Sequence, residues 1–416
     1  MKFKKDISTI GEQCTGCGAC SAICPLGCIQ MKVDAEGFRM PEIDHTVCLN
    51  CGKCVKICPA YNDTIQYDPV RVLAAASYDE EGCQRSSSGG VFYEAARYVI
   101  QSLHGYVCGA VLDDDLQLKH IVTDSMRDVV KMQGSKYIQS DITGCYSEIQ
   151  NHLKKHQVVL FCGTPCQVAG IEHFLGKTNG LVTMDLICHG TPSAYAFSEY
   201  MHKKYPEEKY FDFSFRQKNI HTKSLFSYHY FSKNKKGNMK IAKRVLSSQD
   251  PFYQAFLNGD NYRESCYICK YAKDSRCGDI TIGDCANYRA YELPLNKELS
   301  TVCINTENGE KMWNAISERF CSATADYKRE VQLNAQLHTP ARRTIQRNDF
   351  YKDIKQMSEY SLKQKYCPRK GIKAVVKDFF IWHTTPEIRD NFKQGFQGVF
   401  LKRRNHRCTR GTNKIK

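Results

Sequence analysis

The sequence predicts an α+β protein in three parts: a cysteine-rich module at residues 1–62, a mixed α/β domain at 63–340 and a basic extension at 341–416. Three observations support this division. Cysteines stand at regular spacing near the start, and strand and helix patterns alternate after Tyr61. The last 26 residues contain eight Lys or Arg and no acidic residue.

The cysteine content indicates metal binding in a reducing compartment. The 23 cysteines among 416 residues are too many for packing alone, and disulfide frameworks are typical of small secreted chains. No apolar stretch approaches the length of a transmembrane segment, and the start MKFKKDISTIGEQ lacks the apolar run of a signal peptide. We therefore expect a cytoplasmic protein. The net charge of +15 overstates the folded charge, because metal-bound cysteines are thiolates, and no nucleic-acid motif accompanies it.

The first module carries a duplicated cysteine motif. Each copy reads C-x2-C-x2-C-x3-C-P, at Cys14, Cys17, Cys20 and Cys24, and again at Cys48, Cys51, Cys54 and Cys58. In this spacing three close cysteines hold one 4Fe–4S cluster and the fourth ligates the other. We therefore expect cluster one on Cys14, Cys17, Cys20 and Cys58, and cluster two on Cys48, Cys51, Cys54 and Cys24. Two full copies with both prolines argue against zinc sites. Cys28 lies outside the pattern, as a packing thiol, and residues 8–62 resemble bacterial two-cluster ferredoxins.

The second domain alternates strands with helices, which is typical of an α/β sheet. Strands are expected at 71–76, 105–112, 156–161 and 181–187, and helices at 91–103, 166–175 and 193–205. Residues 225–246 read as a basic hairpin with the turn KNKKGN, and 278–284 and 301–305 as further short strands.

Two groups of residues in this domain suggest ligand sites. Ser86–Gly90 directly precedes a helix, where small residues and the helix N-terminus favour a phosphate; the alternative is an ordinary helix cap. Cys162, Cys166 and Cys188 fall at loops after successive strands, which gather at one sheet edge, and a Cys266-x2-Cys269 pair follows. A third metal–sulfur site is favoured over a zinc knuckle or buried free thiols.

At FCGTPCQVAG, DLICHGTPS and CYICKY…CGDITIGD, together with SSSGGVF and QGSKY, the chain resembles the coenzyme F-420 hydrogenase/dehydrogenase β-subunit family over roughly residues 8–310. The resemblance implies a flavin-binding α/β domain behind the ferredoxin-like module. By the same resemblance, the flavin phosphate loop includes Ser88, Gly89 and Gly90, and a segment near the flavin includes Ser135, Lys136 and Tyr137. The implied ligands of a third 4Fe–4S cluster are Cys166, Cys188, Cys266 and Cys269, with Cys162, Cys277 and Cys285 as competitors.

The resemblance implies an oxidoreductase with FAD or FMN. It would pass electrons between a two-electron donor or acceptor (a deazaflavin such as coenzyme F-420, a nicotinamide or an organic substrate) and the ferredoxin-type clusters, and so to a redox partner. Two alternatives are an electron-transfer adaptor without flavin turnover and a ferredoxin-linked reductase of a metabolite such as a carbohydrate.

Three single residues and the basic tail complete the expectations. Lys136 either steadies flavin charge or is a solvated lysine, His189 either donates a proton or is structural, and Arg216 either binds an anion or is a surface cation. In the tail, Phe392, Phe396 and Phe400 repeat every four residues, as in a helix that docks on an anionic membrane or an acidic partner; a merely solvated tail is the alternative.

Overall fold

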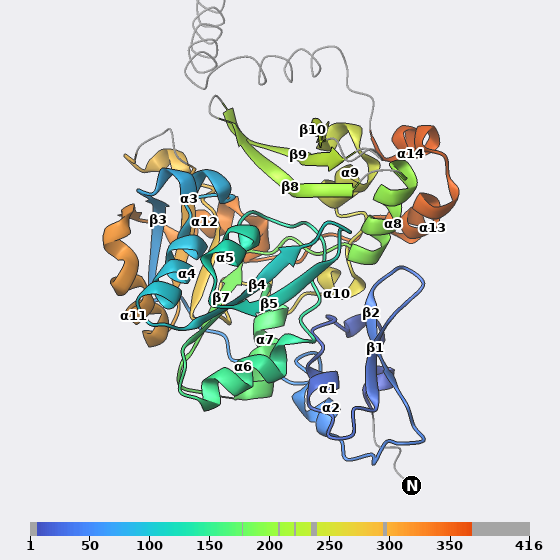
Figure 1. Cartoon of the computed structure of the whole chain (residues 1–416), viewed down its shortest axis with the longest axis horizontal. Coiled ribbons are helices and arrows are strands. Elements are labelled where there is room, and N and C mark those ends of the chain that lie inside the picture. Colours follow the sequence, from blue (N-terminus) through green and yellow to red (C-terminus); the bar gives the residue numbers. More distant parts are fainter. Residues whose placement is uncertain are drawn as a thin grey trace, which may run out of the picture.

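A computed structural model gives the fold of the chain, which is drawn in Figure 1. It describes residues 6–176, 178–206, 209–219, 222–233, 239–293 and 298–367. The three phenylalanines of the basic tail and most of the expected turn KNKKGN lie outside these residues.

The N-terminal module consists of two short helices and a β-hairpin. Its elements are α1 (Ala19–Ala22), β1 (Ile29–Val33), β2 (Arg39–Ile43) and α2 (Lys53–Ile57). Strands β1 and β2 pair antiparallel, with Ile29 opposite Ile43. Both helices start from a glycine in the left-handed region, Gly18 at φ 77° and Gly52 at φ 72°, a conformation that other residues adopt rarely. The motif glycines therefore turn the chain directly after the second cysteine of each set.

The body of the molecule is built on one eight-stranded mixed sheet. In spatial order its strands are β13 (Phe320–Thr324), β3 (Arg71–Ser77), β12 (Ser300–Ile304), β11 (Ile280–Asp284), β7 (Leu181–Leu186), β6 (Val159–Gly163), β4 (Tyr106–Leu112) and β5 (Leu118–Thr123). Strands β3, β11, β7, β6 and β4 run in the same direction, while β13, β12 and β5 run against them. The loops that follow the five parallel strands therefore meet at one edge of the sheet.

Helices cover both faces of this sheet. One face packs against α4 (Val91–Gln101), α5 (Met126–Met132) and α11 (Glu307–Ile316). The other packs against α6 (Cys145–Lys154) and α7 (Pro165–Leu175), and the N-terminal module lies beyond α7 (Figure 1). The short helices α3 (Glu80–Arg85) and α12 (Tyr327–Leu333) flank β3 and β13. Helix α7 therefore lies between the sheet and the cysteine-rich module.

A second, three-stranded antiparallel sheet packs beside the first, on a core rich in aromatic side chains. Its strands are β8 (Lys209–Asn219), β9 (Thr222–Lys233) and β10 (Met239–Leu246). The surrounding helices are α8 (Ala194–Lys204), α9 (Pro251–Asn258), α10 (Glu264–Tyr267), α13 (Arg347–Gln356) and α14 (Glu359–Tyr366). Phe350 and Tyr366 are buried in this core. The folded unit thus extends past the domain boundary that we expected at residue 340.

The expected strands and helices of the second domain are confirmed, with ends that differ by one to three residues. The hairpin expected at 225–246 exists as β9 and β10, but a third strand, β8, was not foreseen. Among the residues that the structure describes, none of the helices is long and apolar enough to cross a bilayer.

Candidate functional site

The cysteines expected to hold cluster one lie together in the N-terminal module. Cys14, Cys17, Cys20 and Cys58 are all buried, and the pKa values of Cys17 and Cys20 are raised, first by burial and then by the other thiols of the set. The hydroxyl of Tyr146, on α6, donates to the carbonyl oxygen of Cys17 at 2.7 Å. Four mutually close thiols ionise together only when a cation relieves their repulsion, which suits the iron of a cluster.

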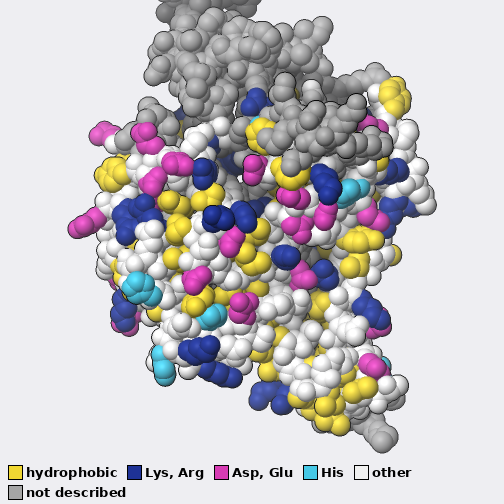
Figure 2. All heavy atoms as spheres, viewed as in Figure 1, with side chains coloured by type: hydrophobic (Ala, Val, Ile, Leu, Met, Phe, Trp, Pro, Cys, Tyr) yellow, Lys and Arg dark blue, Asp and Glu magenta, His cyan; other side chains and the backbone are white. Residues whose placement is uncertain are grey.

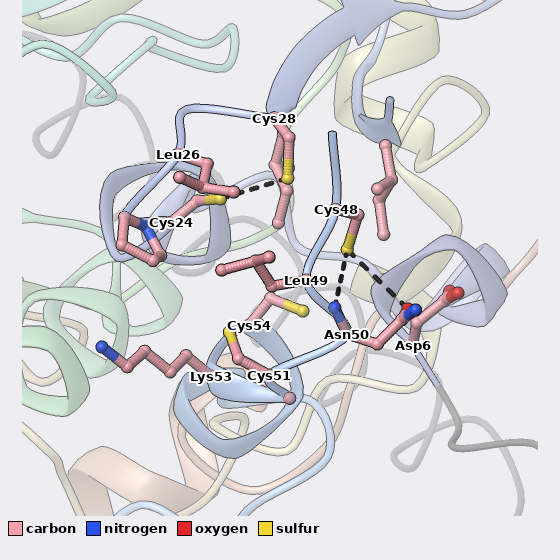
Figure 3. Close-up of a pocket in the computed structure, with 14 residues that line it drawn as sticks. Asp6, Cys24, Leu26, Cys28, Cys48, Leu49, Asn50, Cys51, Lys53 and Cys54 are labelled. Atoms are coloured by element: carbon pink, nitrogen blue, oxygen red, sulfur yellow. Dashed lines mark hydrogen bonds between the residues drawn. The ribbon is translucent and has the colours of Figure 1, made fainter. Parts of the chain in front are cut away.

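The cysteines expected to hold cluster two line one pocket. Cys24, Cys48, Cys51 and Cys54 surround this space in Figure 3, together with Cys28. The sulfur atoms of Cys24 and Cys28 are 3.3 Å apart. Cys28 is therefore a fifth thiol beside the expected ligand set, although it lies outside the sequence motif.

Cluster two is the more exposed of the two expected sites. Cys51 is exposed, and Leu26 and Leu49 at the pocket rim are 45% and 70% exposed. Figure 2 shows hydrophobic side chains gathered at this end of the molecule. The expected second cluster therefore lies at the more solvent-accessible end of the module.

The four cysteines implied for a third cluster come together at the edge of the main sheet. Cys166 lies in the first turn of α7 after β6, Cys188 follows β7, and Cys266 and Cys269 lie in and after α10. The pKa of Cys166 is raised by burial and then by Cys188, Cys269 and Cys266. Burial and the neighbouring thiols raise the pKa of Cys188 to about 12 and that of Cys266 to about 11.

The three competing cysteines have other partners. Cys162 lies within β6, where its electrostatic neighbours are Asp185 and Lys136. The Cys277 thiol donates to the carbonyl oxygen of Pro165 at 3.3 Å, and the Cys285 thiol donates to Glu330 at 3.4 Å. Cys277 also has Cys166 among its electrostatic neighbours, so the choice of ligands stays a prediction. Within the described residues, no three His, Cys, Asp or Glu side chains converge closely enough to hold a single metal ion.

Helix α7 connects the third set of cysteines with cluster one. Its start is fixed by Pro165 and by a capping box in which Thr164 and Gln167 bond each other's backbone. Gly170 lies one turn after Cys166 on the same face. A Cβ atom at Gly170 would lie 3.0 Å from Cβ and 3.2 Å from Sγ of Cys17. Cys17, Cys166 and Cys269 accordingly pack in one apolar cluster.

The serine-glycine loop lies at the same sheet edge, before α4. The hydroxyl groups of Ser87 and Ser135 are 2.7 Å apart, as are those of Ser88 and Ser300. Lys218, on β8, donates to the carbonyl oxygen of Ser88. An anion bound here would meet the N-terminus of α4 and a neighbouring cation, as a flavin phosphate requires.

The two glycines of the loop have distinct structural roles. Gly90, at φ 81°, is the left-handed N-cap residue directly before α4. A Cβ atom at Gly89 would collide with the carbonyl oxygen of Ala75 in β3. The space that we expected to receive a phosphate at Gly89 is thus filled by strand β3, so close packing is what requires glycine there.

The remaining expected residues lie around this edge. Lys136 donates to the carbonyl oxygens of residues 131–134 at the end of α5, so the solvated-lysine alternative is wrong. The ring of Tyr137 stacks on Phe256, with centroids 4.5 Å apart. Arg216 is nearly buried and pairs with Asp284 at 2.5 Å and Glu298 at 3.4 Å, which corrects the surface-cation reading. Burial lowers the pKa of His189, which Asp284 partly offsets.

Sequence reasoning missed Tyr146, Gly170 and Arg263, which join the body to the cluster-one loop. None lies in a motif with a known spacing, and each acts through residues that are far away in the sequence. Only a contact map could have identified them.

Comparisons with known proteins agree with this division of the chain. Residues 13–62 match the model of the 4Fe–4S dicluster domain. Residues 156–330 match the model for the C terminus of the beta subunit of coenzyme F420 hydrogenase/dehydrogenase.

Individual proteins are similar to the chain as well. It is 25% identical to the coenzyme F420-dependent sulfite reductase of Methanocaldococcus jannaschii over 320 residues, 73% of this chain and 46% of that protein. The chain thus spans about half the length of this relative. A chain of the solved F420-reducing [NiFe] hydrogenase complex from Methanosarcina barkeri aligns with 18% identity and a TM-score of 0.43, over 64% of this chain and 90% of the other.

Proposed function

Because the chain joins a 4Fe–4S dicluster domain to a β-subunit domain of the coenzyme F420 hydrogenase/dehydrogenase family, we propose that it is a flavin- and iron–sulfur-dependent oxidoreductase. It exchanges an electron pair with a two-electron donor or acceptor and single electrons with a redox partner protein. Reduced coenzyme F420 is the first donor to test, since the curated relative depends on it.

The observation that supports the proposal is that Cys166, Cys188, Cys266 and Cys269 are electrostatic neighbours of one another, at the start of the helix α7 that also touches Cys17. A protein that only held two ferredoxin-type clusters would not need four more half-buried thiols at the sheet edge. A third 4Fe–4S cluster on these residues would receive electrons at the edge and pass them along α7 to cluster one.

The flavin would supply hydride chemistry, since it accepts two electrons with a proton and releases them singly. The chain's own residues bind and orient it. The N-terminus of α4 and Lys218 would hold its phosphate, and Lys136 fixes the end of α5 beside Ser135. The side chains of Arg216 and Asp284, joined across the edge, close the site toward β8.

The experiment replaces both Cys266 and Cys269 with serine in the full chain, purified anaerobically. The wild-type protein should contain about twelve irons and the variant about eight, from four irons per cluster. Flavin should still be reduced by the donor, whereas electrons should reach the N-terminal clusters at least tenfold more slowly. Cys285→Ser is the matched control and should keep all twelve irons. Unchanged iron content in the double variant would contradict the third cluster.

A non-enzymatic adaptor is the alternative function, and flavin content separates the two. The oxidoreductase releases about one flavin per chain on denaturation, whereas an adaptor releases none. A donor screen with reduced coenzyme F420, NADH and NADPH then identifies the two-electron substrate.

A further inference from the structure

Arg263 is a buried arginine at the junction between the body and the cluster-one loop. Its side chain is only 3% exposed, and its Nε donates to the carbonyl oxygen of Cys14 at 2.6 Å. One Nη donates to Gln139 at 2.9 Å, and the other lies 2.7 Å from the carbonyl oxygen of Arg39 and 2.8 Å from the sulfur of Met40. The guanidinium also lies over the ring of Phe38, 5.2 Å from its centroid.

All of these acceptors are neutral, which distinguishes Arg263 from the other deeply buried arginines. Arg276 pairs with Asp185 at 2.7 Å, and Arg347 pairs with Glu36 at 2.5 Å. In the described part of the chain, Arg263 has no carboxylate within ion-pair distance. A buried cation without a counter-charge is costly, so such a group points to an anion that the protein binds nearby.

The anionic group that fits is the cluster held by the loop that Arg263 touches. A Cβ atom at Gly16 would lie 2.9 Å from Nη1 of Arg263, so the absence of a side chain there lets the guanidinium lie against the Cys14–Cys17 turn. Four thiolates around an oxidised 4Fe–4S core carry a net charge of about −2. Arg263 also directly precedes α10.

We propose that Arg263 is the counter-charge of cluster one and sets its reduction potential. The proposal rests on the assignment of that cluster to Cys14, Cys17, Cys20 and Cys58. Reduction adds one negative charge to the cluster, so a nearby fixed cation stabilises the reduced form more than the oxidised form. Arg263 therefore makes cluster one a better electron acceptor, which draws electrons from the body into the module.

The test compares three full-length variants by anaerobic redox titration, with iron and sulfide content measured on each. Arg263→Gln removes the charge, Arg263→Lys keeps the charge without the guanidinium fork, and Arg347→Gln removes a charge-compensated arginine that also ties the module to the body. Cluster two serves as an internal reference within each protein.

In R263Q the equilibrium constant for reducing cluster one should fall at least tenfold. For a one-electron couple this lowers the reduction potential of the cluster by about 59 mV. R263K should show less than half of this shift, and R347Q should show none. The reduction potential of cluster two should stay unchanged in all three variants. An unchanged cluster-one potential in iron-replete R263Q overturns the proposal, as does an R263K shift as large as that of R263Q.

Two further outcomes are decisive. If R263Q takes up no iron, then R263K must load iron with a nearly wild-type potential; failure of both variants would mean that the shape of the fork matters and not its charge. If the wild-type protein itself lacks about eight irons in its first module, the cluster assignment fails and not the role of Arg263 alone.

Discussion

Single residues explain why the chain tolerates so close an approach between distant segments. Gly16, Gly89 and Gly170 each face an atom of another element closer than a Cβ would allow. The cysteine ligands could be predicted from the sequence, because cluster ligation requires a fixed local spacing. The contacts of these glycines could not, because they depend on which segments the fold brings together.

The first prediction concerns Gly89, where a methyl group would collide with the backbone of β3. Gly89→Ala should destabilise the protein by about 1–3 kcal/mol, the usual cost of overpacking. The thermal midpoint under anaerobic conditions measures the effect. Gly144→Ala is the control, since nothing lies within 4 Å of a Cβ atom there. Equal midpoints for the two variants would contradict the packing role of Gly89.

The second prediction concerns the pH dependence of stability through Glu172. Burial raises the pKa of its carboxyl group to about 8, and Asp279 and Asp185 add to the shift. Because an unfolded glutamate titrates near about 4.3, the folded protein binds a proton that the unfolded chain releases. The stability that this group contributes is therefore complete below about pH 4.3 and is lost as the pH rises to about 8.

Glu172→Gln removes this dependence. The variant should match the wild-type stability near pH 5 and exceed it near pH 8.5 by on the order of 2 kcal/mol, a value reduced for partial exposure. Anaerobic urea unfolding at the two pH values measures the difference. If the difference in unfolding free energy between variant and wild type is the same at both pH values, Glu172 does not bind the extra proton of the folded protein.

Among the elements, α7 does the most to organise the site. Its first turn, at the sheet edge, contains Cys166, and its next turn touches Cys17 of the N-terminal module through Gly170. Its sequence pattern predicted a helix at 166–175, and the helix spans Pro165–Leu175. In contrast, β8 was not predicted. It is stabilised by pairing with β9 and by the aromatic core beneath the second sheet, and neither contact is visible in its local sequence. Helices α13 and α14 were assigned to the C-terminal extension for the same reason. They are mostly polar, and their sequence does not show that their few apolar residues pack on the aromatic core.

The third prediction tests the contact between α7 and cluster one. Gly170→Ala should displace the Cys17 loop by a few tenths of an ångström, and Gly170→Leu should displace it far more. We expect Gly170→Ala to keep the irons of cluster one with an altered electron paramagnetic resonance signal, and Gly170→Leu to lose about four irons. Normal iron and an unchanged spectrum in Gly170→Leu would mean that α7 does not touch cluster one.

At the scale of the whole molecule, the cysteine-rich module is held against the body at several separate points. Arg347 makes two bonds to Glu36 in the turn between β1 and β2, at 2.8 and 2.5 Å. Lys355 donates to the carbonyl oxygen of Ala35 at 2.7 Å, and Lys270 to that of Ala60 at 2.9 Å. The module therefore contacts the body at both its hairpin and its last residues.

The last prediction follows from this attachment. Glu36→Ala removes the main carboxylate partner of the buried Arg347, which keeps Glu264 at 3.3 Å and the carbonyl oxygen of Tyr262 at 2.7 Å. The hairpin should loosen at a cost of about 1–2 kcal/mol, since Glu36 is itself 36% exposed. Amide hydrogen exchange across β1 and β2 should become faster, while the iron content stays at the wild-type value. Because electron transfer falls steeply with distance, the rate from the body to cluster one should drop while the potential of that cluster stays unchanged.

This pattern separates the attachment of the module from the electrostatic role of Arg263, which should alter the potential. Faster exchange with an unaltered transfer rate would mean that the contacts of α7 alone hold the two parts at their working distance.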